Sequence, residues 1–269
     1  MPGSKHIVAA IALALGGFGT QLNAADFSAT AGLRAAFLAS NPTQARLDPK
    51  TGGVSGPAAG LARELARRIG VTVSFTAVAN PQAVMDSIRS GAADTGFVAY
   101  DTGRARDVAF SQTYLLAWNT YLVPQASPLL NVAEVDLPGV RIGVAQGDAG
   151  HLHLQRVLRH AELRPTPPGP IDVALKRLAD GEIDAIAANR TRLPEAAAKN
   201  PALRVLPDNF LGVQQSIIVG RGEASRLAAV NRLIDDARGS ELIRRAIERV
   251  SLKGVDVAPA DDARRQTPG

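Results

Sequence analysis

Short apolar runs alternate with amphipathic stretches along the chain, and this order predicts strands and helices in turn. Residues 33–39, 71–78 and 94–99 are dense in apolar and β-branched side chains, which is typical of strands. Residues 57–70 repeat leucine or isoleucine every fourth position and end at glycine, and residues 81–91 run from proline to glycine; both patterns predict helices. The resulting β-α-β-α-β order predicts a parallel sheet covered by helices.

A second series of the same kind begins after residue 140. Residues 87–99 and 177–189 share one pattern, in which a helix end, a glycine and an aspartate precede an apolar strand. We therefore expect an α/β protein with two similar lobes that face each other, joined by extended crossovers near Tyr121 and Gln215. The further predicted elements are strands at 140–147, 183–189 and 213–222, an extended piece at 203–207, and helices at 148–160, 171–181, 190–200, 223–238 and 241–250.

These elements divide the chain into four parts. Residues 1–25 combine Lys5, an apolar run and small residues, as a secretory signal peptide does. A buried helix or a membrane anchor is the alternative, although the run is shorter than the ~20 residues that span a bilayer. We expect the first lobe at residues 30–120 plus 216–255, the second lobe at residues 125–212, and a loose tail at residues 256–269.

Composition narrows the function class. Aromatic residues make up only 4% of the chain, which leaves no stacking platform for nucleic acid. The net charge is +5, but arginines alternate with acids along helices, so a solvated surface explains them and we expect no nucleic-acid partner. There is no cysteine, hence no disulfide, thiol nucleophile or lipid-bearing cysteine. An exported chain without lipid or span needs a second membrane to retain it, which favours the periplasm.

The histidines and the known catalytic motifs give no indication of a metal site or of an enzyme. His151 and His153 lie two residues apart on a predicted helix and point to different sides, so we expect no metal site. No Ser-His-Asp arrangement, Gly-x-Ser-x-Gly turn or phosphate loop is recognisable. We therefore assign no catalytic residue and no cofactor, and we expect a protein that is not an enzyme.

The strand at 94–99 ends in a small polar turn that carries Arg104. In open α/β sheets the loops after the strands are where ligands bind. A guanidinium presents paired donors that match the two oxygens of a carboxylate. The alternative is an Arg104 that pairs with Asp101 or Asp107 at the surface. Arg106 is the rival cation in this turn, and we expect it to point outward.

Six segments in order resemble the family 3 periplasmic solute-binding proteins, the receptors of amino-acid-type ABC importers. The resemblance implies a two-lobed type II periplasmic binding protein fold, a small polar solute that is amino-acid-like or carries a carboxylate, an ABC permease at the inner membrane as partner, and a monomer. The segments are LRAAFLASNP (33–42), GLARELARRIGVTVSF (60–75), SIRSGAADTGFVAYDTGRARDVAFSQTYL (87–115), LPGVRIGVAQGDAG (137–150), LADGEIDAIAAN (178–189) and VNRLIDDARGSELIRRAIERV (230–250).

The resemblance also implies a binding site. Arg104 falls where family members hold a ligand carboxylate, and backbone N–H groups of the turn formed by Tyr100, Asp101 and Thr102 would add donors. Asn41, after the first strand, is either a polar contact or a turn residue before Pro42.

Two positions depart from the family pattern. Asp148, beside Ala149 in the turn that opens the second lobe, replaces the usual serine or threonine and is either a helix N-cap or a cleft residue. Asn189 replaces the aspartate that binds an amino group, and it brings no charge. Either Asp148 or Asp101 then supplies the anion, or the solute is not a simple α-amino acid.

Two other functions are compatible with the same fold. A periplasmic cyclohexadienyl dehydratase, which acts on prephenate or arogenate, resembles these receptors and would need a general acid in the cleft, a role open to Asp148 or Asp101. A sensor-delivery protein would bind its solute and dock on a membrane receptor.

Overall fold

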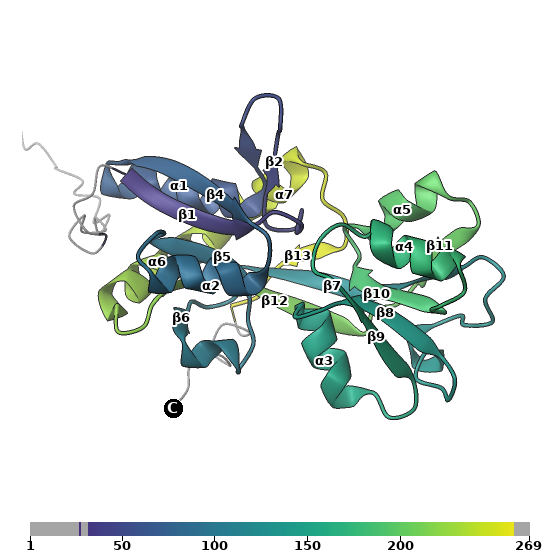
Figure 1. The fold of residues 1–269 in the computed structure, drawn as a ribbon. Helices are drawn as coiled ribbons and strands as arrows, with labels where there is room; N and C mark the ends of the chain where they lie inside the picture. The colour runs from purple at the N-terminus through teal and green to yellow at the C-terminus, as the bar shows by residue number, and fades with distance from the viewer. Residues whose placement is uncertain (1–26, 28–31, 261–269) are drawn as a thin grey trace, which may run out of the picture.

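The computed structural model describes Phe27 and residues 32–260, which form two α/β lobes on one continuous sheet (Figure 1). The expected signal peptide, residues 1–25, lies outside the described residues, as do residues 261–269. The strand order of the sheet is β4 (Thr72–Val78), β1 (Gly32–Leu38), β5 (Thr95–Ala99), β12 (Leu211–Gly220), β7 (Leu115–Pro124), β10 (Ala185–Asn189), β8 (Arg141–Ala145) and β9 (Glu162–Thr166). The two lobes are therefore built on the two ends of one sheet. A site that contacts both lobes must lie between these ends.

The first lobe is built on β1 (Gly32–Leu38), which pairs in parallel with β4 (Thr72–Val78) and β5 (Thr95–Ala99). Alternate residues of β1 point to opposite faces of the sheet. Phe37 packs into the cluster under α1 (Pro57–Ile69) and α6 (Ala224–Gly239), whereas Ala36 packs into the cluster under α2 (Pro81–Arg89). The helices of this lobe are α1 (Pro57–Ile69), α2 (Pro81–Arg89), α6 (Ala224–Gly239) and α7 (Leu242–Arg249).

Helix α1 shows why these segments fold as the pattern predicts. Its apolar positions Leu61, Leu65 and Ile69 are buried, and Gly70 ends the helix in the left-handed conformation with φ 74°. That φ suits glycine, and the N–H of Gly70 bonds back to the last turn. Near α1, β2 (Arg46–Leu47) and β3 (Val54–Ser55) form a short hairpin.

The second lobe is built on β8 (Arg141–Ala145), which lies between β10 (Ala185–Asn189) and β9 (Glu162–Thr166) and runs parallel to both. The sequence pattern does not predict β9, because this edge strand is largely exposed and reads Glu-Leu-Arg-Pro-Thr. The other elements of the lobe are α3 (Ala149–Val157), α4 (Asp172–Ala179), α5 (Leu193–Lys199), β11 (Leu203–Val205) and the 3₁₀ turn η3 (Val132–Glu134).

Two long antiparallel strands join the lobes. The strands β7 (Leu115–Pro124) and β12 (Leu211–Gly220) pair with each other. On their outer sides β12 pairs with β5 of the first lobe, and β7 pairs with β10 of the second. The predicted two-lobed α/β fold with two crossover strands is therefore confirmed. The strand β6 (Val108–Phe110), which follows the 3₁₀ turn η2 (Arg104–Arg106), also pairs with β12.

The C-terminal segment differs from the loose tail expected from residue 256. The strand β13 (Val255–Val257) pairs with β7, and Ala258 is only 1% exposed. The indole N–H of Trp118 donates to the carboxylate of Asp256 at 2.6 Å, and Arg238 donates to the Ala258 carbonyl oxygen at 2.9 Å. Three residues are too few to show a strand period, so only tertiary packing defines this element. No helix among the described residues is long and apolar enough to cross a membrane.

Candidate functional site

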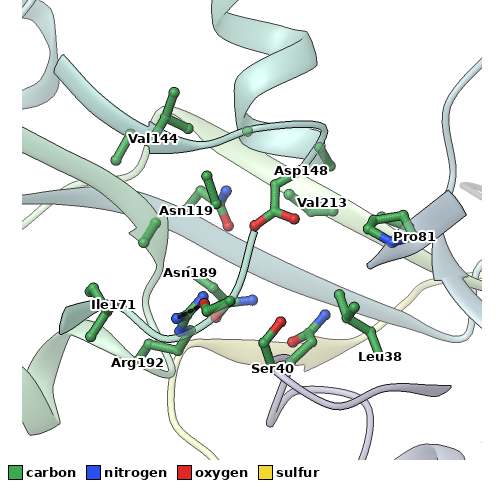
Figure 2. A pocket seen from close by; sticks show the side chains of 18 of the residues that line it. Leu38, Ser40, Pro81, Asn119, Val144, Asp148, Ile171, Asn189, Arg192 and Val213 are labelled. Atoms are coloured by element: carbon green, nitrogen blue, oxygen red, sulfur yellow. Dashed lines mark hydrogen bonds between the residues drawn. The ribbon is translucent and has the colours of Figure 1, made fainter. Parts of the chain in front are cut away.

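A cavity of about 840 Å³, which includes space open to solvent, lies where the two lobes face each other. Figure 2 shows that its lining side chains come from both lobes and from the crossover strands. The polar and charged lining residues include Ser40, Asn41, Gln44, Arg104, Asn119, Asp148, Asn189, Arg192 and Gln215.

Arg104 is buried at the junction of the lobes. It starts η2, the 3₁₀ turn after β5, and it is 8% exposed. Its Nη1 donates to the carbonyl oxygen of Ala99 at 3.0 Å, and its Nη2 donates to the carbonyl oxygen of Gly147 in the second lobe. Burial lowers the pKa of Arg104, while the attraction of Asp101 and Asp148 acts in the opposite direction. The guanidinium thus uses two of its five N–H donors and faces the cavity.

The surface ion pair considered as the alternative is absent from the described residues. Asp101 instead accepts from the N–H of Gly103 at 2.9 Å and pairs with Arg156 of the second lobe at 3.2 Å. Arg106 is exposed.

Asp148 occupies the N-cap position of α3 but does not cap it. Its side chain makes no capping hydrogen bond, and it accepts no hydrogen bond from the described residues. In Figure 2 its carboxylate projects into the cavity. Burial raises the pKa of Asp148, although the attraction of Arg192 and Arg104 opposes this. The structure therefore places Asp148 in the cleft.

Arg192 is a charged cavity residue that the sequence interpretation missed. It follows β10 in the turn that opens α5, and its Nη2 donates to the carbonyl oxygen of Gly169 at 3.0 Å. Burial lowers the pKa of Arg192, although the attraction of Asp148 and Asp172 acts to raise it. A cation just after the carboxyl end of a strand is the same signal that identifies Arg104, but at Arg192 the sequence pattern indicates only the start of a helix.

Three asparagines have different roles at the cavity. Asn189 donates through Nδ2 to the hydroxyl of Thr43 at 2.8 Å and accepts from the N–H of Thr191 at 2.8 Å, so its amide links the lobes. Asn41 lines the cavity and also forms a turn, because its Oδ1 accepts from the N–H of Thr43 at 3.1 Å. Asn119 on β7 is 7% exposed, and its Oδ1 has no partner among the described residues. The sequence interpretation did not single out Asn119.

The turn before Arg104 does not line the cavity. The Tyr100 ring packs edge-on against Phe110 with ring centroids 5.1 Å apart. The backbone N–H of Tyr100 donates to the carbonyl oxygen of Gln214. Thr102 is exposed, and neither it nor Asp101 lines the cavity. The turn directs Arg104 inward and these three residues elsewhere, so the donor role expected of Tyr100, Asp101 and Thr102 stays a prediction that no contact of the described residues supports. Ala149, in contrast, lines the cavity as expected.

The two neighbouring histidines take up separate positions. His151 accepts at Nδ1 from the N–H of Gly147 at 3.2 Å, and His153 stacks on Phe210 with centroids 6.2 Å apart. Within the part of the chain that the structure describes, no group of three or more histidine or acidic side chains is placed to hold a metal ion.

Two α/β lobes, two crossover strands and a charged cavity between them define a bilobal binding protein. The model of the bacterial extracellular solute-binding proteins, family 3, matches residues 33–250. The chain belongs to this family, and it is a solute-binding protein.

Solved structures show the same fold. A mutant of the arginine-binding protein from T. maritima is 22% identical with a TM-score of 0.68, covering 81% of this chain and 94% of that one. An ancestral arginine-binding protein bound to arginine is 21% identical with a TM-score of 0.69, covering 82% and 98%. The binding protein AbpA from Streptococcus pneumoniae, bound to L-arginine, is 19% identical with a TM-score of 0.69, covering 83% and 97%. No curated protein sequence matches the chain significantly.

Proposed function

We propose that this protein binds a small polar solute, amino-acid-like or carboxylate-bearing, in the cavity between its lobes and delivers it to an ABC importer. The observation that carries the proposal is the buried guanidinium of Arg104, which faces the cavity from the first lobe while its Nη2 reaches Gly147 of the second. A cation at this junction attracts a carboxylate, and a solute held there contacts both lobes.

Binding then favours the closed arrangement of the lobes. The structure already has interlobe contacts, namely Arg104 with Gly147, Asn189 with Thr43, and Asp101 with Arg156. A solute that touches both lobes has a higher affinity for this closed form than for an open one, so it shifts the population toward closure. The crossover strands β7 and β12 are the connections about which the lobes move.

The similar structures support an amino-acid-like solute and an importer as partner. Five of them hold arginine, another is an ancestral arginine-binding protein bound to glutamine, and another is the substrate-binding protein of an amino acid ABC transporter. We propose by analogy that the protein works as a monomer in the periplasm. Loss of uptake of the solute on deletion of the gene, with restoration by the intact chain, tests the delivery step. Cell fractionation tests the compartment.

A thermal-shift screen over amino acids, amines, carboxylates and opines tests the binding step. A solute at 100 times its Kd adds roughly 2.7 kcal/mol to the free energy of unfolding, a shift that is readily measured. Arg104→Ala abolishes the shift and Arg106→Ala, on the exposed side of the same turn, retains it. A solute that shifts both variants equally would place binding outside the cleft. Turnover of prephenate or arogenate by the purified protein would instead favour the dehydratase.

A further inference from the structure

Among the described residues, three charged side chains line the cavity: Arg104 from the first lobe, and Asp148 and Arg192 from the second. None of the three forms an ion pair with another described residue. The two guanidiniums bond only to backbone carbonyl oxygens of Ala99, Gly147 and Gly169, and the carboxylate accepts no hydrogen bond from described residues. The cleft thus presents two cations and one anion that are left for a ligand.

Buried charges are costly unless they are paired and hydrogen-bonded. The matching ligand brings two anions and one cation, so its charges complement the cleft one by one. A solute with a net positive charge, such as arginine, would add positive charge to a cleft that already has one more cation than it has anions. The charge pattern therefore separates this cleft from those of the arginine-bound structures with the same fold.

We infer that the solute is a small amino dicarboxylate, whose carboxylates bind Arg104 and Arg192 and whose ammonium binds Asp148. This inference rests on the proposed function, because it assumes that the solute occupies this cavity. It names the solute class and assigns Arg192 and Asp148 as the residues that select it.

The position of the ammonium follows from the other acceptors. Asn189 has no charge, and its amide is engaged by Thr43 and Thr191. Asp101 is outside the cavity and pairs with Arg156. Among the described residues that line the cavity, Asp148 is the one with an acidic side chain, so it is the acceptor for the ammonium.

Asn119 provides a second, independent acceptor on the same side of the cavity. Its Oδ1 is buried without a partner among the described residues, and Figure 2 shows its side chain beside that of Asp148. An ammonium has three N–H donors, enough to reach both the carboxylate and this amide oxygen. Both acceptors therefore point to a ligand that donates at this place.

Calorimetric titration of the purified protein with five probes tests the inference. L-Glutamate and L-aspartate carry both carboxylates and the ammonium, glutarate lacks the ammonium, L-glutamine lacks the second carboxylate, and L-arginine reverses the net charge. We expect L-glutamate or L-aspartate to bind tightest. Glutarate and L-glutamine should each bind about 10-fold to 100-fold more weakly than L-glutamate, the loss of one charge-assisted contact.

Two variants assign the contacts. Arg192→Gln should remove the preference for L-glutamate over L-glutamine but keep the preference for L-glutamate over glutarate. Asp148→Asn should remove the preference for L-glutamate over glutarate but keep the preference for L-glutamate over L-glutamine. Arg106→Gln, an exposed arginine of the first lobe, is the matched control. Circular dichroism checks the fold of each variant, and Arg192→Met, which is also uncharged, replaces Arg192→Gln if that variant does not fold. Arg192→Lys, which keeps the charge, should keep the preference for L-glutamate over L-glutamine.

The failures of the two proposals are distinguishable. If L-arginine or another solute of zero or positive net charge binds more tightly than both acidic amino acids, and Arg104→Ala abolishes that binding, the solute class is wrong but cleft binding stands. If the two acidic amino acids bind and neither Arg192→Gln nor Asp148→Asn changes the selectivity, the residue assignment is wrong. If no probe binds, the inferred class is overturned, and the wider screen decides on cleft binding.

Discussion

Arg104 makes one contact within its own lobe and one contact to the other lobe. Its bond to Ala99 stays within the first lobe, while its bond to Gly147 crosses to the second. A guanidinium is suited to this position because it keeps its charge despite a lowered pKa and offers donors in several directions.

Arg104→Ala should therefore weaken solute binding at least about 100-fold, as loss of a buried charged contact does. The free energy of unfolding without solute should change by only about 1 kcal/mol, the value of one hydrogen bond within a lobe. Calorimetric titration and denaturant unfolding of the same samples measure the two effects. A loss of several kcal/mol without solute would show that Arg104 is mainly a structural residue.

Asp148 should lower the stability of the empty protein at neutral pH. Its pKa in the folded state is raised above the unfolded value near 3.8, so between these two pKa values the folded state binds more protons and stability falls as the pH rises. Burial outweighs the attraction of Arg104 and Arg192 in this balance.

Asp148→Asn should therefore raise the Tm of the solute-free protein at pH 7. The gain should shrink as the pH falls from the folded-state pKa toward the unfolded value near 3.8, because over that range the folded protein takes up the proton and regains stability. Thermal unfolding of both proteins from pH 4 to pH 8 gives the two curves, with Asp107→Asn as an exposed control. A variant that is less stable than the parent at pH 7 would mean that the carboxylate stabilises the fold.

The sequence predicts those residues of the site that a single local motif is enough to identify. Arg104 and Asp148 each follow a strand of recognisable pattern, and the structure places both in the cavity. Asn119 lies within a crossover strand, where nothing local separates a cavity residue from a core residue. Whether the turn at Tyr100 faces the cavity depends on the 3₁₀ geometry of η2, which sequence spacing does not define.

At the scale of elements, helices and buried strands follow from their periods, and edge strands do not. The helix α1 and the strands β5, β8 and β10 have continuous apolar patterns. The strand β9 is polar because one side of it faces solvent, and β13 is short. Their pairing partners, β8 and β7, are what make them strands.

The rim of the cleft carries an ion pair between elements of different lobes. Arg156 on α3 donates to Asp101 at 3.2 Å, and its side chain is 58% exposed. Such a pair contributes roughly 0.2–1 kcal/mol, and salt screens it.

Arg156→Gln should therefore weaken solute affinity by no more than about 5-fold at low salt, with a smaller effect at 1 M salt. Calorimetric titration at both salt concentrations measures the difference. Lys176→Gln, which breaks the pair between Lys176 on α4 and the C-cap residue Asp180, is the matched control and should leave the affinity unchanged. An equal loss of affinity at both salt concentrations would exclude an electrostatic contact at the rim.

At the scale of the whole molecule, the crossover strands support both lobes and the C-terminal segment. The strand β7 pairs with β10, β11, β12 and β13, so it contacts elements from widely separated parts of the chain. The sequence predicts that two crossovers exist, because the βαβ series is repeated on both sides of them. It does not predict that β13 returns to β7, since that depends on where α7 ends.

Deletion of residues 255–269 should lower the free energy of unfolding by about 2–4 kcal/mol, because several hydrogen bonds and a buried alanine are lost. These include the ladder to β7, the Trp118–Asp256 bond and the Arg238–Ala258 bond. Denaturant unfolding measures the change. Deletion of residues 261–269 alone is the control, and equal stability of the two truncated proteins would contradict a structural role for β13.

The most direct test of the account is a crystal structure of the protein with the tightest-binding solute of the screen. The account predicts the solute between the lobes, with an acidic group on the Arg104 guanidinium and further contacts from the second lobe. A solute bound elsewhere, or held by one lobe while Arg104 makes no contact with it, would contradict it.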